Sequence, residues 1–175
     1  ARNLERTLGW TMMEDAGRGW RYIVASPRPR RILDLDLVAS LSDQGYVVIA
    51  AGGGGIPVVR RPDGSHAGVP AVIDKDLTSA LLATSIGADT LLMLTAVQRV
   101  AVDFGKPAQR ALERVTASEL AALQEAGHFG KGSMGPKVDG ALRFLAAGGR
   151  RAIIAHLDEA VPALDGSAGT HVVPG

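Results

Sequence analysis

The sequence lacks several residue types and patterns, and each absence narrows what the protein can be. None of its 175 residues is cysteine, which excludes disulfides and thiolate metal sites. No apolar run is long enough to cross a bilayer. Aromatic residues make up only 4% of the chain and the formal net charge is +1, so no strong field attracts nucleic acid or an anionic membrane. We therefore expect a cytoplasmic protein with neither a nucleic-acid nor a membrane partner.

The residues that are abundant favour a packed α/β fold. Hydrophobic residues make up 46% and glycines number 22, which indicates an aliphatic core and several tight turns. Residues 1–31 are predicted to be irregular. From residue 32, short apolar runs alternate with amphipathic stretches, which predicts a three-layer α/β sandwich with a mostly parallel sheet. Strands are expected at 46–51, 90–94, 151–156 and 170–173, helices at 34–44, 77–86, 116–126, 136–147 and 158–164, and a hairpin at 58–72.

A run of four glycines follows the first predicted strand. Gly52, Gly53, Gly54 and Gly55 come directly after the apolar run at 46–51. Glycines leave no Cβ in the way of a phosphate, and their N–H groups can converge on it. A flexible turn is the alternative, but ligands of α/β sheets bind beyond the carboxyl ends of strands. We expect a ligand-facing loop, which is neither a Walker loop nor a GxGxxG motif.

Two lysines stand at the predicted starts of helices. Lys75 lies between Asp74 and Asp76, where the aspartates alone could serve as caps. A cation at that end of a helix dipole is disfavoured, which suggests a nearby anionic ligand. Lys137 closes a glycine-rich stretch at 130–137 that also holds Met134 and Pro136, and either a phosphate site or a solvated loop fits that pattern.

The remaining candidates are weaker. Thr95 and Val97 follow the strand at 90–94 and could wall an adenine ring, although core packing explains them as well. The four histidines are far apart and lack metal-ligand spacing. No protein residue is therefore assigned as a metal ligand.

An ordered set of segments resembles carbamate kinases, members of the amino-acid-kinase superfamily. The matching segments are residues 14–20, 26–29, 51–58, 71–77, 94–97, 104–107, 127–129, 132–137 and 169–170. Each segment alone is weak evidence for the family, but the ordered set is specific to it. The resemblance runs from about residue 9 to the end. Trp20 and Gly135 depart from the family pattern without removing a charged group.

The resemblance implies a phosphotransferase that interconverts ATP and carbamate with ADP and carbamoyl phosphate, using Mg²⁺. Lys75 and Lys137 would lie along the path of the phosphoryl group, with Asp76 holding both lysines. Gly52 to Gly55 and Asp74 would lie at the phosphates, Thr95 and Val97 about the nucleotide, and Met134 and Pro136 toward the adenine. A homodimer is also implied.

Carbamate kinases have a longer amino-terminal half that grips carbamate. Residues 1–31 are accordingly expected to be the return segment from that half, and residues 32–175 the nucleotide-binding lobe, inactive alone. Two alternatives stay open: a non-catalytic ADP/ATP-binding module, and another amino-acid kinase.

Overall fold

The structure, a computed structural model, describes residues 2–14, 19–130 and 132–175. The segment 14–20 that contributes to the family resemblance therefore lies largely outside the described residues.

The centre of the structure is a four-stranded sheet in the order β5-β9-β10-β8. Its strands are β5 (Thr90–Thr95), β9 (Arg151–His156), β10 (Thr170–Val173) and β8 (Arg114–Thr116). Two of its three pairings are parallel, and β10 runs antiparallel to β9. The prediction of a mostly parallel sheet is confirmed.

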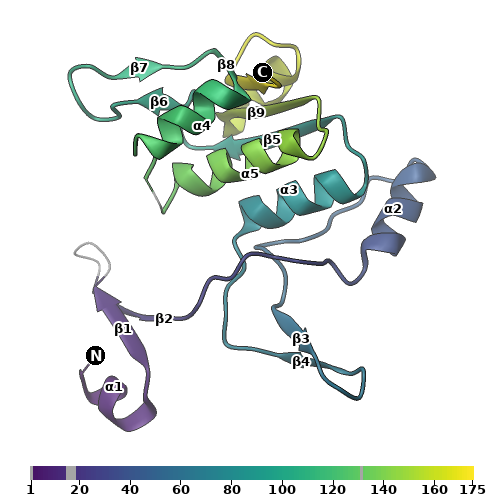
Figure 1. Ribbon diagram of the computed structural model, residues 1–175, viewed down its shortest axis with the longest axis vertical. Coiled ribbons are helices and arrows are strands. Elements are labelled where there is room, and N and C mark those ends of the chain that lie inside the picture. The colour runs from purple at the N-terminus through teal and green to yellow at the C-terminus, as the bar shows by residue number, and fades with distance from the viewer. Residues whose placement is uncertain (1, 15–18, 131) are drawn as a thin grey trace.

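Helices cover both faces of this sheet, as a three-layer fold requires. One face carries α3 (Lys75–Ser85), α4 (Ala117–Glu125) and α5 (Met134–Ala146), which lie side by side in Figure 1. The other face carries the 3-10 turn η1 (Leu157–Glu159) and α6 (Ala160–Leu164). The larger core lies under α3, α4 and α5, where Phe144 and Leu120 are almost fully buried. No helix in the described ranges has the length and apolar character needed to span a membrane.

The predicted helices form close to their expected bounds because their end signals are strong. Thr116 and Glu119 form a capping box at the start of α4, and α2 (Leu35–Asp43) ends just before Gly45, which takes a positive φ of 85°. The predicted hairpin is shorter than expected and consists of β3 (Val58–Arg60) and β4 (His66–Gly68). A further small hairpin, β6 (Ala101–Val102) with β7 (Arg110–Ala111), and the short β8 were not predicted.

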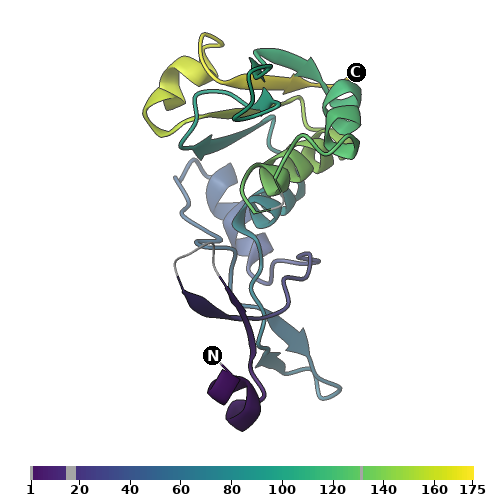
Figure 2. The same ribbon diagram turned by 90° about the vertical axis from the view of Figure 1, so that its left-hand side faces the viewer.

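The prediction that residues 1–31 are irregular is wrong. They contain α1 (Arg2–Leu8) and an antiparallel hairpin of β1 (Thr11–Glu14) and β2 (Trp20–Ile23). The Trp10 and Tyr22 rings lie 4.7 Å apart beside it, and such aromatic neighbours stabilise a strand pair. Figure 2 shows this hairpin at the far end of the molecule from the four-stranded sheet.

The predicted strand at 46–51 is also absent from the structure, although its sequence is apolar. The segment has no assigned strand, and Val47 and Ile49 are 96% and 97% exposed. A strand needs a neighbour for its backbone N–H and C=O groups. Among the described strands, β5 is an edge of the sheet and pairs only with β9, so the apolar run has a β-like composition but no partner.

Candidate functional site

The first turn of α3 is built by an aspartate cap. Asp74 adopts an extended conformation, and its side chain accepts hydrogen bonds from the backbone N–H groups of Asp76, at 2.8 Å, and Leu77, at 3.2 Å. These bonds satisfy helix donors that have no partner within the helix. The capping interpretation of Asp74 is therefore confirmed, and the cap fixes the direction of the residues that follow it.

A buried ion pair joins α3 to α5. The Lys137 ammonium donates to both carboxylate oxygens of Asp76, at 2.8 and 2.9 Å, and each residue is only 7% exposed. A buried charge is tolerated when it is paired and hydrogen-bonded. Because the two residues are 61 positions apart in the sequence, this pair fixes the start of α5 against the start of α3.

The tetraglycine loop docks on the same helix start. The Thr78 hydroxyl donates to the carbonyl oxygen of Gly54 at 2.9 Å. Gly54 has a φ of +126°, and a Cβ built on it would lie 2.0 Å from the Ile73 carbonyl oxygen, so only glycine fits there. Added Cβ atoms on Gly52, Gly53 and Gly55 meet nothing within 4 Å. The loop is thus anchored at one glycine and open at the other three.

The start of α5 offers few free backbone donors beside Lys137, because the Gly135 N–H donates to the Gly130 carbonyl oxygen at 2.8 Å and Pro136 has no N–H. Ser133 precedes the helix but makes no side-chain cap, and the first turn has no acidic residue. The positive end of the helix dipole still favours an anion there. Met134 and Pro136 are half-buried in that turn.

The structure brings together some of the predicted site residues and leaves others apart. Gly54, Asp74, Asp76 and Lys137 are linked through the contacts described above. Lys75 begins α3, but its side chain is exposed and makes no hydrogen bond or ion pair with any residue that the structure describes. Asp76 therefore holds Lys137 alone, and the expectation that it holds both lysines is wrong.

Thr95 and Val97 lie at the end of β5 and just beyond it. Val97 lines a cavity of about 530 Å³ together with Phe104, Gln109 and Glu159. Neither Lys75 nor Lys137 is among the described residues that line this cavity, and a nucleotide role for Thr95 and Val97 stays a prediction.

Two positioning residues were not predicted. Thr78 lies one turn after Asp74, and its hydroxyl also contacts the Asp74 carbonyl oxygen at 3.1 Å. Gly140 lies inside α5, where a Cβ would be 3.1 Å from the Asp76 carbonyl oxygen. A glycine inside a helix pattern is costly and signals close packing, so Gly140 could have been found from the sequence, whereas Thr78 gave no such signal.

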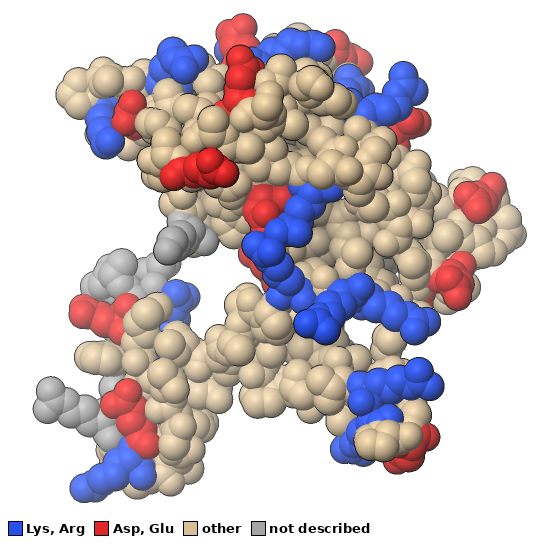
Figure 3. Space-filling model, viewed as in Figure 1, with Lys and Arg blue, Asp and Glu red and all other residues tan. Residues whose placement is uncertain are grey.

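The charges around the site come from several segments. Asp139 on α5 pairs with Arg143 at 3.0 Å and with Arg28 at 3.7 Å, so the proline-rich segment at 26–31 reaches α5. Figure 3 shows basic side chains gathered across the middle of this face, with acidic side chains beside them. In the described ranges no three His, Asp or Glu side chains are grouped as metal ligands, and both Asp76 oxygens already accept from Lys137. These residues therefore do not fit a magnesium site built by the protein alone.

Comparison with known proteins gives consistent results. The model of the "Amino acid kinase family" matches residues 7–156. A carbamate kinase of Thermococcus kodakarensis is 49% identical over 173 residues, which are 99% of this chain and 55% of that protein. The Escherichia coli "Carbamate kinase-like protein YahI" is 49% identical over 94% of this chain and 52% of its own length.

A solved structure of a Giardia lamblia carbamate kinase bound to AMP-PNP superposes with a TM-score of 0.91. It is 43% identical, and the match covers 99% of this chain and 55% of that one. The chain thus spans about half the length of the relatives it matches.

Proposed function

The chain belongs to the amino acid kinase family, and from this premise we propose that it forms the nucleotide-binding part of a carbamate kinase. The reaction would be reversible transfer of a phosphoryl group between ATP and carbamate, giving ADP and carbamoyl phosphate. The observation that carries the proposal is the buried Lys137–Asp76 pair, set at two helix starts beside a glycine loop.

The geometry suits phosphoryl transfer because that reaction depends on positioning and on compensating charge. A lysine ammonium has three donors, and Asp76 accepts two of them. The third donor of Lys137 is left for a phosphate oxygen, while Asp76 fixes where that donor lies. Carbamate is already an anion, so no general base is required.

The proposed nucleotide contacts follow from the same arrangement. The open backbone of Gly52, Gly53 and Gly55 would contact phosphate, with Asp74 holding the turn beside them. Met134 and Pro136 would lie toward the adenine, and Thr95 and Val97 about the nucleotide. Support comes from the Giardia lamblia relative, which is described as bound to AMP-PNP. Magnesium would enter with the nucleotide phosphates, which in kinase sites bind it together with water molecules.

The remaining half of such an enzyme would supply the carbamate site. Residues 1–31 would be the segment returning from that half and residues 32–175 the nucleotide lobe, so we expect no turnover from this chain alone. The exposed apolar side chains of Val47 and Ile49 support this division, because they offer a surface for a further strand. Assembly as a homodimer in the cytoplasm belongs to the same proposal.

A non-catalytic nucleotide-binding module is the second candidate. It is favoured by one observation: the glycine loop and both helix starts lie within this chain. Such a module would bind ADP or ATP without any phosphoryl transfer, so a binding assay run beside an activity assay separates the two candidates.

The decisive experiment measures ATP formation from ADP and carbamoyl phosphate by the complete protein and by its Lys75→Ala variant. Lys75 is exposed and has no described partner, so its removal should leave the fold intact. We expect turnover to fall about 10²–10³-fold, as when one transition-state donor is lost. Lys106→Ala is the matched control, because Lys106 pairs only with Asp103 at the surface. ADP binding without ATP formation would favour the second candidate, and full turnover by Lys75→Ala would remove Lys75 from the mechanism.

A further inference from the structure

A second cavity, lined by neither Lys137 nor Asp76, lies between the starts of strands β5 and β9 and the turn that precedes β10. It has a volume of about 740 Å³ and is lined by Asp89 and Thr90 at the start of β5, Arg150 and Arg151 at the start of β9, and the turn 166–169 after α6. Thr90 and Arg151 are paired directly in the sheet. Strands β5 and β9 are parallel, so their first residues share one end of the sheet. Because β10 runs antiparallel to β9 with Thr170 opposite Ile154, the turn 166–169 lies toward the other end, where this cavity adjoins the one that contains Val97. A cavity of this size suits a small-molecule ligand.

The cavity concentrates positive charge in a chain that is close to neutral. Arg99, Arg114, Arg150 and Arg151 line it against two carboxylates, Asp89 and Glu113, so the arginines outnumber the carboxylates by 4 − 2 = 2. The whole chain carries a formal charge of +1. An excess of this kind attracts anions into a recess more strongly than onto an open surface.

The carboxylates leave two of the four guanidinium groups without a counter-charge. Glu113 pairs with Arg99, and Asp89 lies 3.5 Å from Arg150. Arg151 donates from Nε to the neutral hydroxyl of Thr90 at 3.1 Å. The Arg114 side chain has no hydrogen-bond or ion-pair partner among the described residues. Guanidinium forks match the oxygens of phosphate and carboxylate, so Arg114 and Arg151 are ready to bind one oxyanion.

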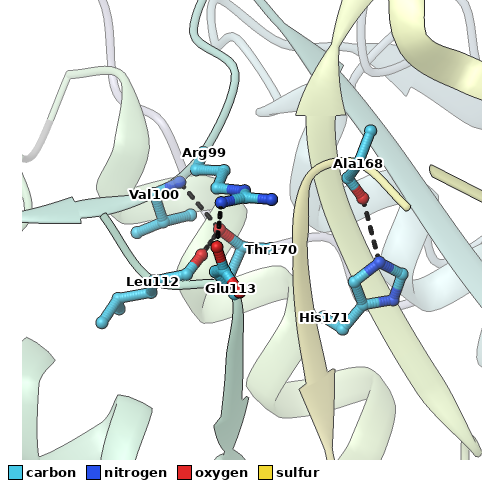
Figure 4. A network of polar contacts seen from close by, with 7 residues as sticks. All are labelled: Arg99, Val100, Leu112, Glu113, Ala168, Thr170 and His171. Carbon is cyan, nitrogen blue, oxygen red and sulfur yellow. Dashed lines mark hydrogen bonds and ion pairs between the residues drawn. The ribbon is translucent and has the colours of Figure 1, made fainter. Parts of the chain in front are cut away.

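The wall of the cavity is fixed by buried hydrogen bonds. Thr170 is 0% exposed, accepts from the backbone N–H of Val100 at 2.9 Å and donates to the carbonyl oxygen of Leu112. These bonds hold the segments that carry Arg99 and Glu113 against β10, as Figure 4 shows. The His171 imidazole Nε2 lies 2.9 Å from the Ala168 carbonyl oxygen. The charged groups therefore project from a preorganised frame, which lowers the entropic cost of binding.

A glycine closes the turn that forms the other wall. Gly169 has a φ of +78°, and a Cβ there would lie 2.8 Å from the Ala155 Cβ and 2.9 Å from the Ile154 carbonyl oxygen. The turn therefore sits directly on β9, and its members Gly166, Ser167 and Ala168 are too small to fill the space. The result is an open recess with a basic rim.

From these observations we propose that this cavity binds a small ligand bearing a doubly charged oxyanion of the phosphate type, at a site that neither Lys137 nor Asp76 lines. Arg114 and Arg151 hold the oxyanion, and Arg150 adds charge at the rim. Asp89 and Glu113 orient Arg150 and Arg99 and repel ligands that carry carboxylates near them. The remaining volume accommodates the rest of the ligand along the turn 166–169.

The test is calorimetric titration of inorganic pyrophosphate into the complete protein at low ionic strength, where rim charges are least screened. Arg114→Ser/Arg151→Ser should weaken binding at least about tenfold, the loss expected when charge-assisted hydrogen bonds are removed. Arg110→Ser is the matched control, since Arg110 is exposed on β7 and lies outside the cavity. It should change the affinity by less than about twofold.

Circular dichroism of each variant ensures that only folded protein is compared. The proposal is overturned if wild-type protein shows no pyrophosphate binding, if the double variant binds as tightly as wild type because the probe occupies another site, or if Arg110→Ser weakens binding equally because the attraction is nonspecific.

Discussion

Residues 2–75 and 76–175 of the same chain differ in how they shelter apolar side chains. Of the described residues, all the fully buried hydrophobic ones lie at Ala80 or beyond. The earlier part exposes Val47 and Ile49 almost completely and Ile56 to 85%. Exposed apolar groups that adjoin one another mark surfaces that another partner covers. The second part thus contains its own core, whereas the first part is held mainly by hairpin hydrogen bonds and by the contacts of Gly54.

The first prediction concerns the largest difference between the two regions. In the 175-residue chain, Phe144→Ala should lower the free energy of unfolding by roughly 3–5 kcal/mol, because it empties a site that is 1% exposed. Val47→Ala should change it by less than about 0.5 kcal/mol, since the side chain is 96% exposed. Urea denaturation followed by circular dichroism measures both.

The same pair of variants in the complete protein sharpens the contrast. If a further strand covers residues 46–51 there, Val47→Ala should become destabilising by about 1 kcal/mol or more, as for a buried Val. An unchanged stability in the complete protein would show that this surface stays open, and the division of the enzyme proposed above would lose its structural support.

The second prediction concerns the ion pair that carries the proposed function. Lys137→Ala leaves the Asp76 carboxylate buried without its partner, which should cost about 3 kcal/mol, the low end for broken buried pairs. Asp76→Asn/Lys137→Ala should recover part of this loss, because the remaining group is no longer charged. The readout is again urea denaturation, with Lys106→Ala as the surface control. Equal stability of the two Lys137 variants would contradict a buried, charged Asp76.

The third prediction addresses the point where the two regions meet. Gly54→Ala places a Cβ 2.0 Å from the Ile73 carbonyl oxygen at a φ of +126°, which should cost roughly 1–3 kcal/mol and displace the loop from α3. Gly53→Ala is the matched control, because its added Cβ meets nothing within 4 Å. Titration of ADP should show weaker binding for Gly54→Ala than for Gly53→Ala. Equal affinities would mean that the docking of the loop does not shape the nucleotide site.

How well the sequence predicts this fold depends on how local the signals are. The cap at Asp74, the capping box at Thr116 and the glycine stops depend on neighbouring residues, so α3 and α4 were predicted nearly to their bounds. The run at 46–51 has the composition of a strand, but strand formation depends on a partner that composition does not reveal. Size and apolarity also fail to mark the buried face of α3, because Asp76, Ala80 and Ala83 are buried while Leu77, Leu81 and Leu82 are only half-buried.

The candidate site was predictable in its residues but not in its pairings. Lys75 and Lys137 stood out because each lies at a helix start, where the positive end of the helix dipole disfavours a cation unless an anion is nearby. The sequence does not reveal that Asp76 pairs with Lys137, which is 61 positions away, and not with its neighbour Lys75. That pairing depends on the close packing of α5 on α3, which Gly140 permits because it has no Cβ. The basic cavity was not predicted, since its arginines come from three separate segments and only the sheet brings them together.

The last prediction has the smallest expected effect and concerns a helix end in the packed region. The backbone N–H and then the hydroxyl of Thr116 donate to the Glu119 carboxylate and lower its pKa below the ordinary value for glutamate, against a small opposing effect of burial. Because the folded-state pKa is the lower one, this stabilisation is complete above the unfolded-state pKa and is lost as the pH falls through the folded-state pKa. Glu119→Gln should therefore lower the melting temperature slightly at neutral pH and match wild type in acid, where both side chains are neutral. Calorimetry at the two pH values measures the difference in melting temperature between wild type and Glu119→Gln. A difference that persists in acid would show that the amide fits the capping box poorly for steric reasons, and that the loss of charge is not the cause.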